Sequence, residues 1–259
     1  MMMMMISRRK ALDMGSGIVM LALLAACSSE SANMTTNVAA SEDIATAAPV
    51  YAMLQVPVGK AGPADYAAQL GTARTAGHIK DVVLLQSKPS VEGPLGFATL
   101  AIVTFKDEAS WNDWNSNAAA KLGRDVEIKR ADMLVDARAK TPAQGAAYVV
   151  NYYSALIPAT EYKTYTEAYI SPNMDMQKAS DALRGYAMYH EHEPPAGRPA
   201  KTILVKEYAS EAAFDRFLTV KDKNKVDLLK NPEWKRINDT KESLRKDISG
   251  TLATPVPLP

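Results

Sequence analysis

An internal repeat limits the possible folds of this chain more than any other feature of its sequence. Residues 105–114 align with residues 208–217, and both follow one pattern: aromatic, any residue, Asp or Ser, Glu-Ala, any residue, aromatic, any two residues, aromatic. Asp107 and Ser210 are typical helix N-caps, and the Glu after each favours the first helical turn. The two aromatic residues are three positions apart, so they share a helix face that can pack on a sheet. The pattern therefore predicts that one strand–helix unit occurs twice.

The elements around the two copies follow the same order. In the first copy, hydrophobic periodicity predicts strands at 50–58, 79–86, 97–105 and 126–137, and helices at 63–76 and 107–123. In the second copy it predicts strands at 147–155, 185–191, 202–208 and 247–256, a helix at 160–183 interrupted near Ser171-Pro172, and a helix from Ser210. The order β-α-β-β-α-β is that of a ferredoxin-like unit. We therefore expect an α+β fold made of two tandem ferredoxin-like units, at residues 49–140 and 146–258.

These repeated helices, together with the turn Asn231-Pro232-Glu233-Trp234-Lys235, resemble the dimeric α/β-barrel superfamily. That group includes small monooxygenases of the antibiotic-biosynthesis type and stress-responsive barrel proteins, and the resemblance covers most of residues 49–258. It implies that two four-stranded antiparallel sheets pair into one barrel. Here a tandem copy would close the barrel within one chain, since each half covers the sheet face that the other leaves bare. The alternative is two independent ferredoxin-like domains joined near residues 140–145.

The first 26 residues have the organisation of an export signal. Arg8, Arg9 and Lys10 precede an apolar run at 18–26 that is too short to span a bilayer comfortably. The run leads into Leu24-Ala25-Ala26-Cys27, which resembles the bacterial lipobox, and Cys27 is the only cysteine of the chain. The resemblance implies cleavage before Cys27 and lipidation of its thiol. A plain secretory signal and an uncleaved anchor remain as alternatives, as do general and twin-arginine export.

A lipidated Cys27 would make the bilayer a permanent partner of the protein. Each buried methylene group contributes about 0.8 kcal/mol, so two or three acyl chains hold a protein at a membrane. The small and polar residues 27–48 would form a flexible tether. Ser28 follows the cysteine, and by resemblance to enteric lipoproteins this favours the outer membrane. We therefore expect a protein of the cell envelope, anchored in the outer membrane and facing the periplasm.

The charge balance and the single cysteine exclude several classes of protein. The chain carries 30 Lys and Arg residues against 29 Asp and Glu residues, so it lacks the basic excess of a nucleic-acid-binding protein. We therefore expect no nucleic-acid partner. One cysteine excludes an internal disulfide framework and any metal site built on a Cys-x-x-Cys motif.

Two histidines form the most suggestive local cluster for chemistry. His190 and His192 lie two residues apart on a predicted strand, so they share a face with Tyr186. Two imidazoles could supply two of the ligands of a zinc, copper or iron ion. The spacing identifies no third ligand, so the pair is only a weak metal candidate. The simpler interpretation is a polar strand end that leads into the turn at Pro194-Pro195.

The tyrosines are concentrated in the second half of the chain. Nine of the eleven lie between Tyr148 and Tyr208. Phenol rings suit a cavity for a small aromatic or amphipathic ligand, and they equally suit an ordinary core. The candidate ligand-binding residues are Tyr148, Tyr152, Tyr186, His190 and His192.

The sequence contains no P-loop, dinucleotide-binding glycine motif, HExxH motif or GxSxG motif, so no motif requires a cofactor. Catalytic residues therefore stay unknown at this stage, and so does the oligomeric state. We expect a non-catalytic domain that binds a small molecule or another protein. The alternative is an oxidase or monooxygenase acting on a small aromatic compound inside the barrel. The family resemblance implies that such an enzyme would be either cofactor-independent or assisted by haem or a metal.

Overall fold

The computed structural model describes residues 48–88, 96–141 and 143–259. The predicted signal at 1–26, Cys27 and the tether up to residue 47 lie outside the described residues. Within the described ranges, no helix is both long enough and apolar enough to cross a membrane.

The first half of the fold contains four strands and two helices in the predicted order. They are β1 (Val50–Val56), α1 (Tyr66–Thr75), β2 (Asp81–Ser87), β3 (Thr99–Phe105), α2 (Glu108–Asn117) with the short helix η1 (Ala119–Leu122), and β4 (Glu127–Ala137). Asp107 caps α2 by accepting a hydrogen bond of 2.8 Å from the backbone N–H of Ser110. This agrees with the cap predicted by the repeat.

The second half follows the same order with extra helical segments. Its elements are β5 (Ala147–Ala155), α3 (Ala159–Tyr165), the π-helical η2 (Thr166–Ile170), α4 (Ser171–Ala179), β6 (Gly185–Glu191), β7 (Ala200–Tyr208), α5 (Glu211–Leu228), α6 (Pro232–Thr240), η3 (Lys241–Ser243) and β8 (Arg245–Pro255). The interruption of the long helix falls at η2, just before Ser171. The segment from Asn231, expected as a turn, begins α6, because the Asn231 side chain accepts bonds from the N–H groups of Glu233 and Trp234.

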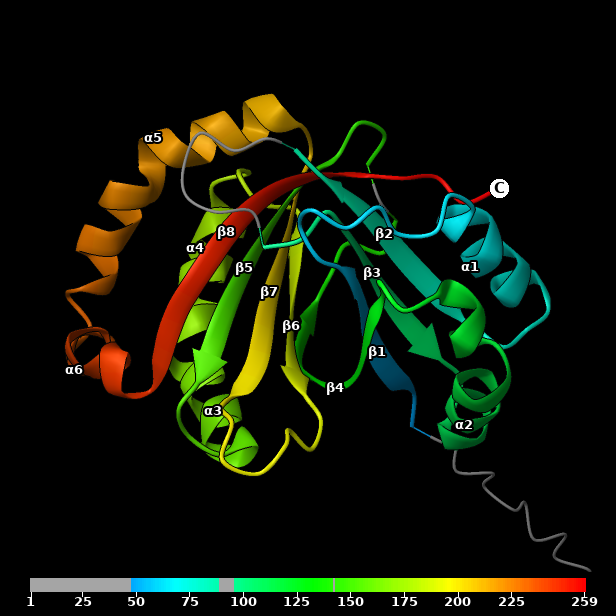
Figure 1. Cartoon of the computed structure of the whole chain (residues 1–259). Coiled ribbons are helices and arrows are strands. Elements are labelled where there is room, and N and C mark those ends of the chain that lie inside the picture. The colour runs from blue at the N-terminus through cyan, green and yellow to red at the C-terminus, as the bar shows by residue number, and fades with distance from the viewer. Residues whose placement is uncertain (1–47, 89–95, 142) are drawn as a thin grey trace, which may run out of the picture. The chain divides into compact units, whose positions relative to one another are not determined.

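The eight strands form one closed barrel within the chain (Figure 1). The strand order is β1-β3-β2-β8-β5-β7-β6-β4, and all neighbouring strands are antiparallel. Each half contributes four adjacent strands in the ferredoxin-like order. The halves meet at β2–β8 and at β4–β6. The prediction of two tandem ferredoxin-like units that pair into one barrel is confirmed, and the alternative of two independent domains is wrong.

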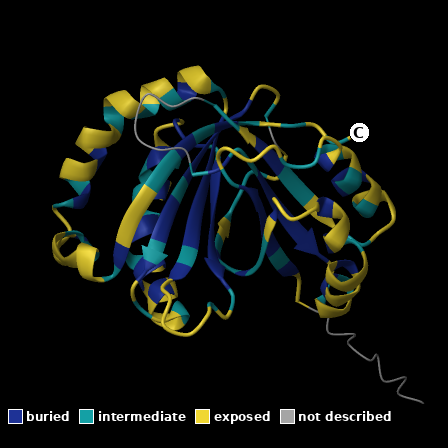
Figure 2. Ribbon diagram, viewed as in Figure 1, coloured by how far each residue is buried: buried dark blue, intermediate teal, exposed yellow. Residues whose placement is uncertain are grey.

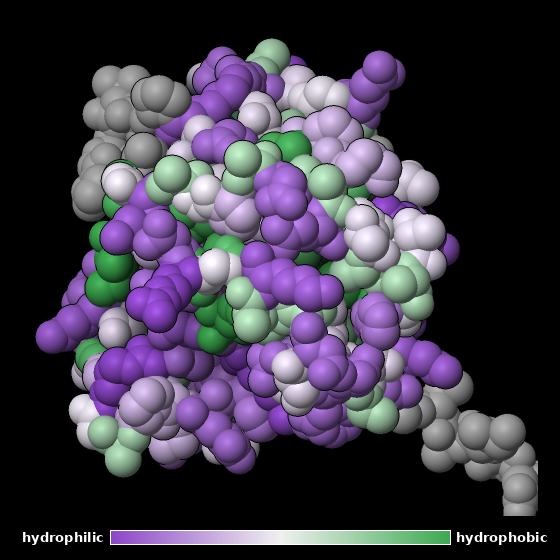
Figure 3. Space-filling view, turned by 45° about the vertical axis from the view of Figure 1, so that its right-hand side comes forward, coloured by the Kyte–Doolittle hydropathy of each residue, from purple (hydrophilic) through white to green (hydrophobic). Residues whose placement is uncertain are grey.

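The helices cover the outside of the barrel, with α1 and α2 over one half and α3 to α6 over the other (Figure 1). Most strand residues are buried, whereas the outer faces of the helices are exposed (Figure 2). The C-terminal segment after β8 returns to the first half, where Pro259 contacts Gly71 of α1. On the face shown in Figure 3, hydrophilic residues dominate and the more hydrophobic ones appear in patches between them.

The repeat produces the same aromatic contacts in both halves. Phe105 packs against Trp111 and Trp114 of α2, with ring centroids 5.2 and 5.3 Å apart. In the second half, Tyr208 packs against Phe214 and Phe217 of α5 at 5.2 and 5.9 Å. Phe105 and Tyr208 therefore face the helices, and the residue before each faces the interior of the barrel.

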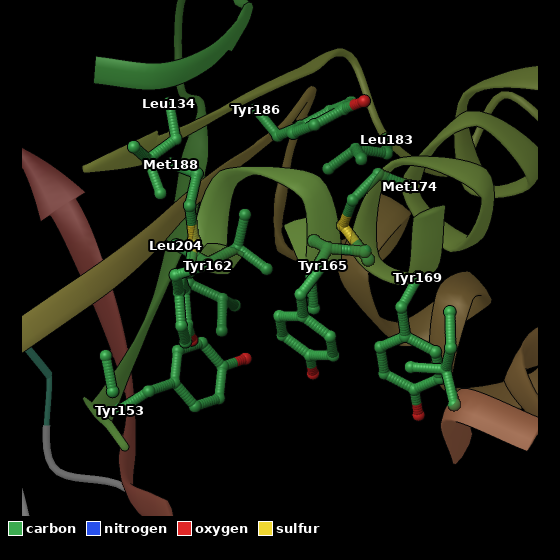
Figure 4. Packing of buried hydrophobic residues seen from close by; sticks show 14 of the residues in the cluster. Leu134, Tyr153, Tyr162, Tyr165, Tyr169, Met174, Leu183, Tyr186, Met188 and Leu204 are labelled. Carbon is green, nitrogen blue, oxygen red and sulfur yellow. The ribbon is translucent and has the colours of Figure 1, made fainter. Parts of the chain in front are cut away.

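Several of the tyrosines belong to the core between the barrel and the helices of the second half. Tyr162, Tyr165 and Tyr169 pack there together with Tyr153 (Figure 4). The rings of Tyr165 and Tyr169 are stacked, with centroids 5.4 Å apart. For these residues the ordinary-core interpretation holds.

Candidate functional site

A pocket of about 420 Å³ opens into one end of the barrel, where β1 and β5 begin and β3 and β7 end. This volume lies in the range of sites for small organic ligands. Both halves of the chain contribute to the pocket. Its lining consists of Asp81, Val82, Val83, Ile102, Asp136, Arg138, Ala139, Lys140, Tyr148, Gly185, Tyr186, Ala187, Tyr189, Val205 and Glu207.

Two phenols line the inner part of the pocket. Tyr148 and Tyr189 are only 4% and 1% exposed and belong to the cluster of residues inside the barrel. Tyr51 packs on Tyr189, with ring centroids 5.8 Å apart. Burial raises the pKa of Tyr189, and burial together with the negative charge of Glu207 raises the pKa of Tyr148. Both hydroxyl groups are therefore neutral hydrogen-bond donors at neutral pH.

Glu207 is the buried carboxylate of the pocket. It lies opposite Tyr148 in the pairing of β5 with β7, and it is only 7% exposed. Its Oε1 accepts a hydrogen bond of 3.1 Å from the Ala143 N–H and lies 3.4 Å from Nη1 of Arg184. A carboxylate held in place by these two partners is a candidate to accept a proton from a bound molecule.

The rim of the pocket is built by the segment after β4. Arg138 makes two parallel hydrogen bonds with Asp136, at 2.8 and 2.7 Å. The bonded guanidinium lowers the pKa of Asp136. At Gly185, a Cβ atom would lie closer than 3.0 Å to the backbone of Arg138 and Ala139. Glycine is therefore needed there for this segment to approach β6 and complete the rim.

The structure separates the two tyrosines predicted on β5. Tyr148 and Tyr152 both point into the barrel, as their spacing predicts. Only Tyr148 reaches the pocket. Tyr152 lies toward the other end, with its ring 6.1 Å from that of Phe97, and its buried hydroxyl has no hydrogen-bond partner among the described residues.

The other three predicted residues do not form a site together. Tyr186 borders the pocket, but its hydroxyl donates to Asp175 of α4 at 3.2 Å and its ring belongs to the helix-side core (Figure 4). His190 also faces the helices, where its ring lies 5.9 Å from that of Tyr162 and its Nδ1 donates to the Glu191 carbonyl. Burial lowers the pKa of His190, which favours the neutral imidazole.

His192 lies beyond the end of β6 and points away from the pocket residues. Its Nδ1 is 2.9 Å from a carboxylate oxygen of Asp132. Among the residues that the structure describes, no group of three or more His, Cys, Asp or Glu side chains is arranged to hold a metal ion. His190 and His192 therefore lie in different surroundings, and neither borders the pocket.

Sequence reasoning missed Tyr189, Glu207 and the charged rim. The repeat contained the signal for Glu207, because Tyr208 aligns with Phe105 and must face the helices. Its neighbour Glu207 then faces the interior of the barrel. The charged residues of the rim, Asp136 and Arg138, carry no comparable sequence signal.

The residues of the pocket do not fit a haem or a metal ion. The described lining contains no histidine, cysteine or methionine, and its carboxylates, Asp81, Asp136 and Glu207, are not grouped so that they could hold a metal ion. The raised pKa of Tyr148 and of Tyr189 disfavours the phenolate that a metal would require as a ligand.

The fold and the pocket define a dimeric α/β-barrel architecture closed within one chain. No protein-family model matches the sequence, and no curated protein matches it. An anthrone oxidase-like protein has the same fold, with a TM-score of 0.53 and 8% identity over 81% of this chain and 91% of that chain. A proposed monooxygenase from Lactobacillus acidophilus aligns over 80% of this chain and 93% of that chain, at 13% identity and a TM-score of 0.45.

These likenesses correct the main functional prediction. A solved structure with this fold is described as an anthrone oxidase-like protein. The expectation of a non-catalytic binding or interaction domain is therefore wrong, and the enzymatic alternative agrees better with the comparison.

Proposed function

We propose that this protein is an oxidase or monooxygenase that acts on a small aromatic compound in the barrel pocket. The observation that carries the proposal is Glu207, a buried carboxylate that borders a pocket of about 420 Å³ beside two neutral phenols. The fold shared with an anthrone oxidase-like protein supports the choice of reaction class.

The arrangement suits the oxidation of an activated methylene group by dioxygen. Glu207 would accept a proton from the methylene carbon of a reduced aromatic ketone, and the resulting carbanion would transfer its electrons to dioxygen as a C–O bond forms. The hydroperoxide then loses water and leaves a second carbonyl group. One CH₂ group and one O₂ become one C=O group and one water, so atoms and electrons balance.

The two phenols would stabilise the charge that develops on the substrate oxygen. Tyr148 and Tyr189 can each donate a hydrogen bond, since their raised pKa values keep them protonated. Their burial places these donors in a medium that screens charge less than water does.

Oxygen uptake by the full-length protein tests this proposal, with anthrone and a substituted catechol as probes. We expect uptake with at least one probe, and Glu207→Gln should lower kcat by about 100-fold or more. Glu161→Gln, at an exposed position of α3, is the matched control and should keep full activity. The proposal would be contradicted if neither probe gave oxygen uptake, or if Glu207→Gln kept full activity.

We further propose that the enzyme is a lipoprotein of the cell envelope, attached through Cys27 and facing the periplasm. The support is the lipobox-like segment 24–27, with the single cysteine at its last position. Labelling with radioactive palmitate followed by membrane fractionation tests this. Cys27→Ser should abolish the label and release the protein from the outer membrane fraction, whereas an unchanged distribution would contradict the anchor.

A further inference from the structure

The partners of the Glu207 carboxylate come from outside its own strand. Ala143 lies in the linker between the two halves, and Arg184 lies just before β6. The Arg184 guanidinium contacts Glu207 through Nη1 at 3.4 Å and donates from Nη2 to the carbonyl of Thr141 at 3.0 Å. One side chain therefore joins the carboxylate to the linker.

The backbone strengthens this connection. The Arg184 N–H donates a hydrogen bond of 2.8 Å to the carbonyl of Glu207. The next residue, Gly185, allows the backbone at Ala139 to approach β6. The linker is thus held against β6 and β7 beside the pocket, and Arg184 is the cation within 4.0 Å of the Glu207 carboxylate.

We propose that Arg184 is a positioning residue, which holds Glu207 and the linker in the geometry needed for proton transfer. This inference rests on the proposed role of Glu207 as the base. Tyr148 faces the same carboxylate from β5, and Asp81 of β2 borders the pocket with it.

A purely structural role for Arg184 predicts a different outcome. Its side chain is 32% exposed, but the Glu207 carboxylate is buried, and loss of one partner of such a pair lowers stability. That role therefore predicts a lower melting temperature with the kcat of the folded protein unchanged. A small displacement of a catalytic group can, however, slow a reaction by about 100-fold.

The test compares Arg184→Gln with Arg184→Lys in the full-length protein, using oxygen uptake with anthrone. We expect kcat of Arg184→Gln to fall by about 10- to 100-fold with KM changed by less than about threefold. Arg184→Lys should restore much of kcat, and Arg216→Gln, at an exposed position of α5, should behave as the native protein.

A second readout separates this inference from the proposed function. Amide hydrogen exchange at Ala143 should be about tenfold faster in Arg184→Gln, since the acceptor of that N–H is less well held. If the native protein oxidises no probe, the proposed function fails, and the exchange rate alone decides on the positioning role. An unchanged exchange rate at Ala143, or a raised KM at native kcat, would overturn the assignment of Arg184.

Discussion

Tyr148 and Glu207 lie directly opposite each other on β5 and β7, with both side chains inside the barrel. The equivalent pair in the first half is Tyr51 and Thr104, on β1 and β3. The phenol is thus present in both halves, whereas the carboxylate is present in one. Glu207 is therefore the one buried carboxylate of the described pocket lining, and the two tyrosines can be replaced one at a time.

Tyr148→Phe should lower kcat by about 100-fold, because one hydrogen-bond donor to the developing oxyanion is removed. The ring remains, so we expect little change in the melting temperature. Tyr66→Phe is the matched control, since its buried hydroxyl donates to the Leu54 carbonyl on the helix side of β1. Steady-state oxygen uptake of the two variants checks the prediction, and equal losses of activity would contradict it.

Gly185→Ala should destabilise the fold by about 1–3 kcal/mol and weaken substrate binding. The new Cβ would collide with backbone atoms of Arg138 and Ala139, which cannot rotate away. Gly250→Ala on β8 is a suitable comparison, because there the added atom meets only the end of the Asn151 side chain. Chemical denaturation of both variants gives the free energies of unfolding. If Gly185→Ala lowers the free energy of unfolding no more than Gly250→Ala does, the backbone of the rim can move away from the added Cβ atom.

Lys206→Met should stabilise the protein by roughly 3 kcal/mol at pH 7. Lys206 is buried on β7 under Phe217, and burial, followed by the charge of Arg245, lowers its pKa from 10.5 to about 8. Below pH 8 the folded state must keep a poorly solvated charge, so the cost is fully present there. Methionine fills a similar space without that charge.

The pH dependence gives the same prediction an independent check. Between pH 8 and 10.5 the unfolded chain holds the Lys206 proton and the folded chain has lost it, so stability should rise with pH. Denaturation curves at several pH values should show this rise in the native protein and its absence in Lys206→Met. Lys225→Met, at an exposed position of α5, should retain the rise.

Ser210→Ala should cost about 1 kcal/mol of stability, because the Ser210 hydroxyl accepts a hydrogen bond from the Ala213 N–H at the start of α5. Ser210→Asp should keep most of that stability, since a carboxylate can accept the same bond. Thermal unfolding of the two variants distinguishes them. If Ser210→Ala were as stable as the native protein, the Ser210 cap would not contribute to the stability of α5.

The fold could be predicted from the sequence because the repeat fixes both the unit and its orientation. In each repeated segment, the aromatic residue at the strand end and the two aromatic residues of the helix pack on the same side of the sheet. Each unit then has one uncovered sheet face, and the two uncovered faces can cover each other. The order of the elements predicted the two units, and the resemblance to the dimeric α/β-barrel superfamily implied that they pair into one barrel. The extra helix after Asn231 was missed because its start, Asn-Pro-Glu, is equally typical of a turn.

The site could be predicted only in part. Of the candidate residues, Tyr148 lies inside the barrel at the pocket, whereas the candidates on β6 lie on the face toward the helices. Every residue of β6 is buried, because one face of the strand packs inside the barrel and the other packs against the helices. The sequence of β6 therefore does not indicate which face is the interior one. Tyr189 lies on the interior face, whereas Tyr186 and His190 lie on the face toward the helices.

Closure of the barrel within one chain has a consequence for stoichiometry. When two identical chains form such a barrel, every residue of the barrel is present twice, at two positions related by symmetry. In a tandem chain the two copies can differ, and here Thr104 of the first copy occupies the position equivalent to Glu207 of the second. The duplicated protein can therefore bind an unsymmetrical molecule in one orientation, with one turnover site for each polypeptide.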